Sequence, residues 1–156
     1  MSLGSNFGKS LGPLNPKLLR EGLRSIRRDL SVVHKSLLDF QLRVQEGLDE
    51  RRYSSADLLQ LSIQHEDFEW LRLISTLMVR IDDVVDEELI EEVKHEGDEV
   101  IAELQQLFSP EVADDKRSDF KRRLEIAINK DPHLFVEVGK IRGRLKETGA
   151  ANGETK

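Results

Sequence analysis

Eight apolar residues near the start of this 156-residue chain recur at alternating steps of four and three residues. They are Leu19, Leu23, Ile26, Leu30, Val33, Leu37, Phe40 and Val44. This spacing is the a/d pattern of a helix that packs lengthwise against other helices, as in a coiled coil. A β-strand cannot produce it, because strand side chains alternate with period two. The sequence therefore predicts an all-α fold, an up-and-down helical bundle.

Similar periodicity divides the rest of the chain into helices. The expected helices cover about residues 16–46, 55–63, 68–85, 88–108, 117–129 and 132–145. Asn15-Pro16 begins the first helix, because Asn caps well and Pro is tolerated in the first turn, and Gly47 is expected to end it. Four principal helices and a short fifth would form one bundle domain over residues 15–147. Residues 1–14 are expected to be a flexible arm and residues 148–156 a flexible tail.

The composition excludes several classes of protein. The chain has no cysteine, which excludes disulfides, thiolate metal sites and cysteine nucleophiles. No apolar run approaches the ~18 residues of a membrane span, and the N-terminus lacks the hydrophobic region of a signal peptide. A cytoplasmic location without membrane contact is therefore expected. The sequence also lacks a glycine-rich phosphate loop, a nucleophile elbow and a zinc signature.

Charge is segregated along the chain in the order basic, acidic, basic. Residues 82–103 hold eleven acidic residues and one base, Lys94. Residues 17–35 hold six bases against Glu21 and Asp29, and residues 116–123 hold five bases against one acid. The formal net charge of −6 argues against broad nucleic-acid binding by the whole surface.

Four arginines follow one side of the first helix: Arg20, Arg24, Arg27 and Arg28. They can pair with the acidic helix at residues 88–108, either within the chain or across a dimer. If they are free of partners within the chain, they can instead contact RNA or an acidic protein. Exposed ion pairs contribute only ~0.2–1 kcal/mol each, so such pairing would set helix register more than stability.

Asp82, Asp83 and Asp86 form an Asp-Asp-x-x-Asp sequence, in which the three carboxylates share part of a helix face. The pattern resembles the box with which all-helical isoprenoid synthases hold magnesium and a diphosphate. Hard cations such as Mg²⁺ prefer carboxylate oxygens. The resemblance covers five residues, and the chain has no second acidic box of that family. The three aspartates are candidate magnesium ligands.

Two further acidic pairs extend this candidate site. Glu88-x-x-Glu91 and Glu96-x-x-Glu99 have the spacing with which helical nucleotide pyrophosphatases bind magnesium. Acidic helices also produce such spacings by chance. Together with the aspartates, these pairs define an alternative function, a magnesium-dependent nucleotide or diphosphate hydrolase that uses the acidic cluster at residues 82–99.

Residues 70–82 contain the pattern Trp-Leu-Arg-x-x-Ser-x-Leu-x-x-Arg-Ile-Asp, and residues 34–39 contain His-Lys-x-Leu-Leu-Asp. Together they resemble a family of small bacterial all-helical proteins, over roughly residues 16–90. The resemblance implies a helical fold and supplies no activity. Within it, Arg72, Arg80 and Asp82 interrupt an apolar helix, and a buried Arg–Asp arrangement would need pairing. The two arginines are candidate interaction residues that fix helix packing.

The sequence favours a non-catalytic, cytoplasmic module for protein interaction or regulation, without a cofactor. Its partner would be another protein or a second copy of the chain, recognised through a helix face and oriented by charge. Self-association would use residual apolar surface on the first helix. Carboxylates that converge with Arg72 or Arg80 in a pocket would favour the hydrolase, whereas outward carboxylates would favour the module.

Overall fold

The computed structural model describes residues 15–110 and 117–153, with side chains described as far as Thr148. This part of the chain forms six α-helices and one 3₁₀ helix, and it contains no strand. The elements are α2 (Pro16–Asp49), α3 (Ser55–Gln64), η2 (Glu66–Leu71), α4 (Arg72–Asp86), α5 (Ile90–Phe108), α6 (Ser118–Lys130) and α7 (Pro132–Gly153). The all-α class is confirmed. The arm expected over residues 1–14 lies outside the described residues.

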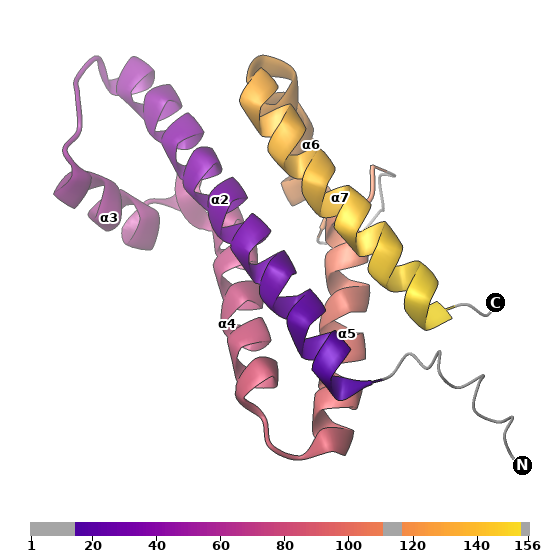
Figure 1. The fold of residues 1–156 in the computed structure, drawn as a ribbon. Coiled ribbons are helices and arrows are strands. Elements are labelled where there is room, and N and C mark those ends of the chain that lie inside the picture. Colours follow the sequence, from indigo (N-terminus) through magenta and orange to yellow (C-terminus); the bar gives the residue numbers. More distant parts are fainter. Residues whose placement is uncertain (1–14, 111–116, 154–156) are drawn as a thin grey trace, which may run out of the picture.

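Four of the helices form a bundle in which each packs against the next (Figure 1). The order of neighbours is α2, α4, α5 and α7, and α7 closes the ring against α2. Neighbouring helices run in opposite directions (Figure 1). As a result α2 and α5, which lie diagonally across the bundle, run in the same direction. With 34 residues, α2 is about 51 Å long and is the element along which the others pack.

The apolar stripe of α2 is buried from Leu19 to Leu37. The prediction is wrong for the last two positions of the stripe, because Phe40 is only half-buried and Val44 is 39% exposed. Gln41 and Gln45 take the buried positions instead. The cause is geometric, since a helix with 3.6 residues per turn drifts about 20° per heptad against a 3.5-residue repeat. The stripe therefore rotates out of the core before the helix ends.

Gly97 allows α2 and α5 to approach across the bundle. It is buried on the core face of α5, at the step of the apolar stripe where the sequence has no side chain. A Cβ at this position would lie 2.9 Å from Cδ2 of Leu19. The Leu19 side chain therefore occupies the space that a larger residue in α5 would need. Leu89 precedes the helix as its N-cap residue and is 64% exposed.

α2 ends later than expected, at Asp49, with Glu50 in the left-handed conformation at φ 53°. The Tyr53 hydroxyl donates to Asp49 Oδ2 at 2.5 Å, and the Tyr53 N–H donates to Glu46 Oε2 at 2.9 Å. The hydroxyl bond is the main cause that lowers the pKa of Asp49. These side-chain bonds fold the chain back after α2, and Gly47 does not end the helix.

α3 lies beside the bundle and packs against η2 (Figure 1). It begins with a capping box, in which Ser54 and Asp57 bond to each other's backbone N–H. None of its residues is buried, and only Leu58 and Leu61 pack against the edge of the core. The break expected at residues 65–67 is the start of η2, which brings the chain back to the bundle before α4 begins.

α7 is longer than the short final helix that the sequence predicted. It continues to Gly153, so residues 148–153, expected in the tail, are helical. The Thr148 hydroxyl donates to the backbone oxygen of Arg144 at 2.9 Å, within the helix. Ala150 and Ala151 follow, and alanine has the highest helix propensity. Neither α7 nor any other helix in the described ranges is both long and apolar enough to cross a membrane.

The close approach at Gly97 predicts a specific loss of stability. Gly97→Leu should lower the free energy of unfolding by about 1–3 kcal/mol, because it overpacks the space filled by Leu19. Gly139→Leu is the control, since a Cβ at Gly139 in α7 would meet nothing within 4 Å. That variant should be as stable as the wild type or more stable, by up to about 1 kcal/mol. Urea denaturation measures both, and equal effects would contradict the packing described.

Candidate functional site

Two arginines of α2, Arg20 and Arg27, reach the C-terminal end of α4 and not α5. Arg27 forms a two-point contact with Asp82, with Nε 3.1 Å from Oδ1 and Nη2 3.3 Å from Oδ2. Arg20 donates from Nη2 to the backbone oxygen of Glu87 at 2.6 Å. Both contacts join the N-terminal half of α2 to the C-terminal end of α4. The structure therefore differs from the expected pairing with the helix at residues 88–108.

His34 lies on the same helix as Arg27 and adds no charge to it at neutral pH. Burial lowers the pKa of His34, and the positive charge of Arg27 lowers that pKa further. The imidazole is therefore neutral at pH 7. The positive charge of α2 comes from its lysines and arginines alone.

A second set of bases on α2 points away from the bundle. This basic ridge consists of four exposed residues, Lys17, Arg24, Arg28 and Lys35. At about 100° per residue, the four positions fall within about 40° of one another, opposite the buried stripe. Arg28 bonds only to Ser25 Oγ, at 3.1 Å. Within the described residues, Lys17 and Arg24 have no hydrogen-bond or ion-pair partner for their side chains.

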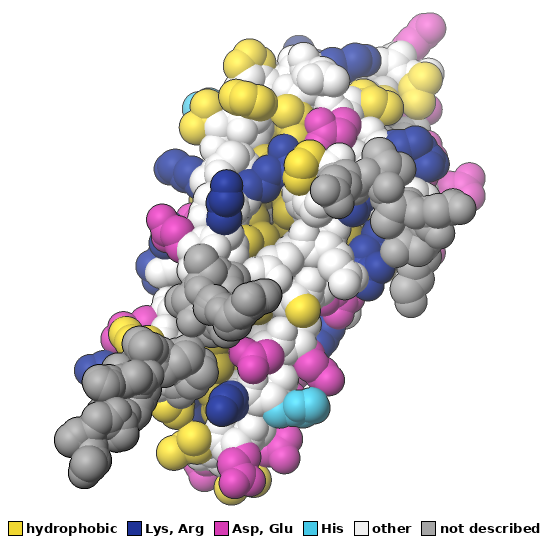
Figure 2. Space-filling model, turned by 90° about the vertical axis from the view of Figure 1, so that its right-hand side faces the viewer, with side chains coloured by type: hydrophobic (Ala, Val, Ile, Leu, Met, Phe, Trp, Pro, Cys, Tyr) yellow, Lys and Arg dark blue, Asp and Glu magenta, His cyan; other side chains and the backbone are white. Residues whose placement is uncertain are grey.

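The outer side of α5 and the turn before it carry the opposite charge. This acidic ridge consists of five exposed residues, Glu88, Glu91, Glu92, Asp98 and Glu99. In the described part of the chain no lysine or arginine pairs with them, and His95 lies 3.3 Å from Glu99. Figure 2 shows acidic side chains gathering toward the end of the molecule where α4 and α5 join. Because α2 and α5 are diagonal in the bundle, the two ridges face opposite sides.

The three aspartates of the Asp-Asp-x-x-Asp sequence have different surroundings. Asp82 is held by Arg27, Asp83 lines a cavity toward α5, and Asp86 is exposed and forms no ion pair with any described residue. Among residues 15–110 and 117–148, no three histidine or carboxylate side chains come together where they could hold a metal ion. The sequence spacing alone therefore does not bring these carboxylates to one point.

Arg80 is the arginine that meets several carboxylates. It lines a cavity of about 270 Å³ between α4 and α5, together with Asp83, Glu96 and Glu99. Its Nη1 lies 2.5 Å from Oε1 of Glu103, which joins the two helices by an ion pair. The guanidinium supplies positive charge to an otherwise acidic cavity, so part of the convergence expected of a hydrolase is present.

Arg72, the other candidate in α4, has a structural contact elsewhere. Its Nη2 donates to the backbone oxygen of Ile63. This bond joins the end of α3 to the start of α4 across η2. Arg72 therefore holds α3 beside the bundle and does not approach the acidic residues of α5.

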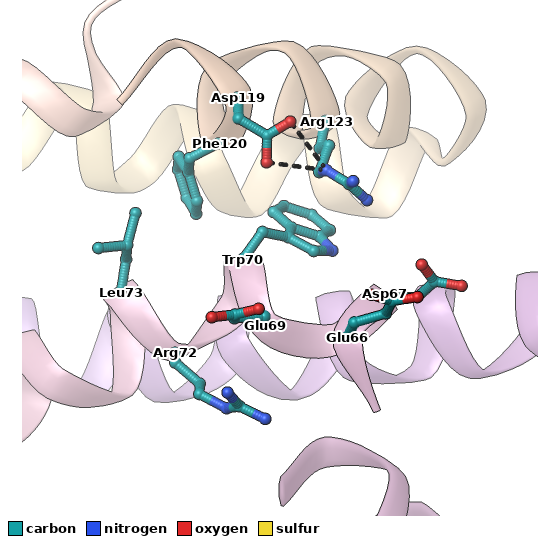
Figure 3. A pocket seen from close by; sticks show the side chains of 9 residues that line it. All are labelled: Glu66, Asp67, Glu69, Trp70, Arg72, Leu73, Asp119, Phe120 and Arg123. Carbon is teal, nitrogen blue, oxygen red and sulfur yellow. Dashed lines mark hydrogen bonds and ion pairs between the residues drawn. The ribbon is translucent and has the colours of Figure 1, made fainter. Parts of the chain in front are cut away.

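A larger cavity, of about 510 Å³, lies between η2 and α6 (Figure 3). Its apolar wall is Trp70, only 7% exposed, and Phe120, whose ring centroid lies 5.6 Å from that of Trp70. The guanidinium of Arg123 lies 5.9 Å from the centroid of the Trp70 ring. Asp119 accepts from Arg123 Nε at 3.1 and 3.2 Å through its two oxygens. The rest of the lining consists of the acidic residues of η2 and, at the start of α4, Arg72 and Leu73.

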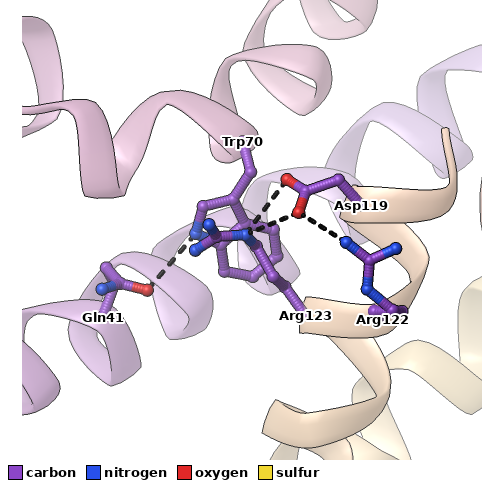
Figure 4. A network of polar contacts seen from close by, with 5 residues as sticks. All are labelled: Gln41, Trp70, Asp119, Arg122 and Arg123. Carbon is purple, nitrogen blue, oxygen red and sulfur yellow. Dashed lines mark hydrogen bonds and ion pairs between the residues drawn. The ribbon is translucent and has the colours of Figure 1, made fainter. Parts of the chain in front are cut away.

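The polar groups around Trp70 satisfy one another (Figure 4). The indole N–H donates to Gln41 Oε1 at 3.3 Å, which explains why a glutamine is buried in α2. Asp119 also accepts from Arg122 Nη2 at 3.1 Å. This network joins α2, η2 and α6, and Trp70 packs in the seam between them. The sequence analysis missed the contribution of α6, although Asp119 with arginines three and four positions later is a visible signal.

Comparisons with known proteins give no further assignment. No family model matches the chain, and no curated protein or solved structure gives a significant match. The charged surfaces of α2, α4 and α5 are the features of the structure that bear on function.

The dispersal of the aspartates predicts that magnesium does not stabilise the fold. In thermal melts, 10 mM MgCl₂ should change the melting temperature of the wild type and of Asp82→Asn/Asp86→Asn equally. A site with Kd a hundredfold below the added concentration would add about 2.7 kcal/mol. For a domain of this size that corresponds to a rise of roughly 5–10 °C. Such a rise, present in the wild type and lost in the double variant, would contradict the prediction.

Proposed function

We propose that the protein is a non-catalytic, cytoplasmic helical-bundle module that binds a protein partner through the charged outer faces of its helices. The observation that carries this proposal is the acidic ridge, whose five carboxylates have no lysine or arginine partner in the described part of the chain. The arginines of α2 that are paired contact α4 instead.

Electrostatics favours a basic partner for this ridge. Like charges three or four residues apart destabilise a helix by a few tenths of a kcal/mol each, so α5 gains from any partner that brings positive charge. Charged and polar groups at an interface steer encounter and select the partner more than they add affinity. A surface of this kind suits a regulatory contact that forms and dissociates readily.

A second candidate function is magnesium-dependent hydrolysis of a nucleotide or diphosphate. One observation supports it, the cavity in which Arg80 lies with Asp83, Glu96 and Glu99. An arginine among carboxylates can bind a phosphate while the carboxylates hold a cation. Against it, Arg80 is already paired with Glu103 at 2.5 Å. The magnesium melts separate the two proposals.

A basic helical peptide tests the interaction module. The probe is a fluorescent amphipathic peptide with lysines along one face, titrated with protein in 50 mM NaCl and followed by anisotropy. Glu91→Gln/Glu92→Gln/Asp98→Asn should weaken binding about tenfold, because three exposed charge contacts at roughly 0.5 kcal/mol each sum to about 1.5 kcal/mol.

The matched control removes three negative charges elsewhere. Glu50→Gln/Glu66→Gln/Glu147→Gln changes exposed acidic residues of other elements and gives the same net charge. This variant should bind the peptide nearly as the wild type does. If both triple variants lose the same affinity, net charge alone governs binding and the acidic ridge is not a recognition surface.

A further inference from the structure

The two ridges are complementary in charge and face opposite sides of one molecule. We infer that the partner of the acidic ridge of α5 is the basic ridge of α2 in a second copy of this chain. The inference rests on the proposed function, since it names the partner of the same surface. It also gives each ridge a partner, since the two ridges do not pair with each other within one molecule.

The acidic ridge is shorter than the basic ridge and fits within its length. From Lys17 to Lys35 the basic ridge spans 18 residues, which is about 27 Å along α2. From Glu91 to Glu99 the acidic ridge spans eight residues of α5, or about 12 Å, and Glu88 lies in the turn before the helix. Both begin at the end of the bundle where α2 starts and α4 joins α5 (Figure 1). A copy placed alongside in the same orientation therefore brings the ridges to the same height.

The charges on each ridge are nearly uniform in sign. Glu21 is an exposed acidic residue of α2 between Lys17 and Arg24. Asp39 lies 3.8 Å from Lys35, the last residue of the basic ridge. Val32, half exposed beside the basic ridge, offers one apolar contact. Because exposed ion pairs contribute ~0.2–1 kcal/mol each, several pairs together give a weak association that salt reverses.

The symmetry of this contact determines whether the copies form a closed dimer or an open-ended assembly. The surfaces that meet are different, so the contact is heterologous, and each added copy leaves one ridge of each sign free. Association of this kind does not stop at a dimer unless the copies close into a ring. The average mass should therefore rise with protein concentration without a plateau at twice the mass of the chain.

Sedimentation velocity on the full chain tests the inference by charge reversal. The wild type should show a concentration-dependent rise in average mass between 10 and 500 µM in 50 mM NaCl, lost in 500 mM NaCl. Arg24→Glu/Arg28→Glu brings the net charge of the basic ridge from +4 to 0, and Glu91→Lys/Asp98→Lys brings that of the acidic ridge from −5 to −1. Each variant alone should stay monomeric. An equimolar mixture of the two should associate, because the unchanged acidic ridge of one variant can pair with the unchanged basic ridge of the other.

The outcomes distinguish this inference from the proposed function. A wild type that stays monomeric at all concentrations, or a mixture that fails to associate, overturns the second-copy contact. If the basic peptide still binds the acidic ridge, the interaction module stands with a different partner. All four positions are exposed, so each variant should fold like the wild type. Circular dichroism of each variant checks this. Binding of a short RNA to the wild type but not to Arg24→Glu/Arg28→Glu, without self-association, would assign the basic ridge to nucleic acid instead.

Discussion

The buried stripe of α2 is the constraint on which the rest of the structure depends. From Leu19 to Leu37 its apolar side chains face inward, and α4, α5 and α7 pack around it. Gly97 removes the side chain of α5 that would collide with Leu19 and lets the diagonal helices approach. Because the apolar stripes of α2 and α5 face this core, the opposite sides of these two helices are free to carry charge.

The periodicity that builds the core was readable from the sequence. The alternating steps of four and three predicted α2 and its buried face. The end of the stripe was not readable from the sequence. Where Gln45 takes the buried position instead of Val44 depends also on the residues that pack against this end of α2. Gln41 is buried only because it accepts from Trp70, a partner 29 residues later in the chain.

The charged residues were harder to place than the apolar ones. The sequence showed that bases and acids are segregated, but not which helices become neighbours in the bundle. Arg27 meets Asp82 because α4 follows α2 around the ring, while α5 lies across it. The same topology separates Asp82, Asp83 and Asp86 among three surroundings. A linear motif could not predict this, since it specifies spacing along the helix and not the residues that face it.

The paired and the unpaired charges therefore have different roles in this account. Arg27, Arg20 and Arg80 join helices within the bundle, and their contacts fix register. The basic and acidic ridges make no such contacts and are available to a partner. Self-association through apolar surface of the first helix stays a prediction from the sequence, and the proposed contact between ridges uses charge instead. Most of the apolar stripe lies in the core, while Leu18, Val32 and Leu48 of α2 are exposed.

The most direct test compares the free energies of unfolding of two variants of α2. One changes arginines of the basic ridge, and the other changes the arginine that pairs with α4. Urea denaturation at a few micromolar protein and low salt would give the free energy of unfolding of Arg24→Gln/Arg28→Gln and of Arg27→Gln. The account predicts that the double variant stays within about 0.5 kcal/mol of the wild type. Arg27→Gln should lose about 1 kcal/mol, because it leaves Asp82 unpaired. An equal or larger loss in the double variant would show that the ridge is paired within the chain and would contradict the account.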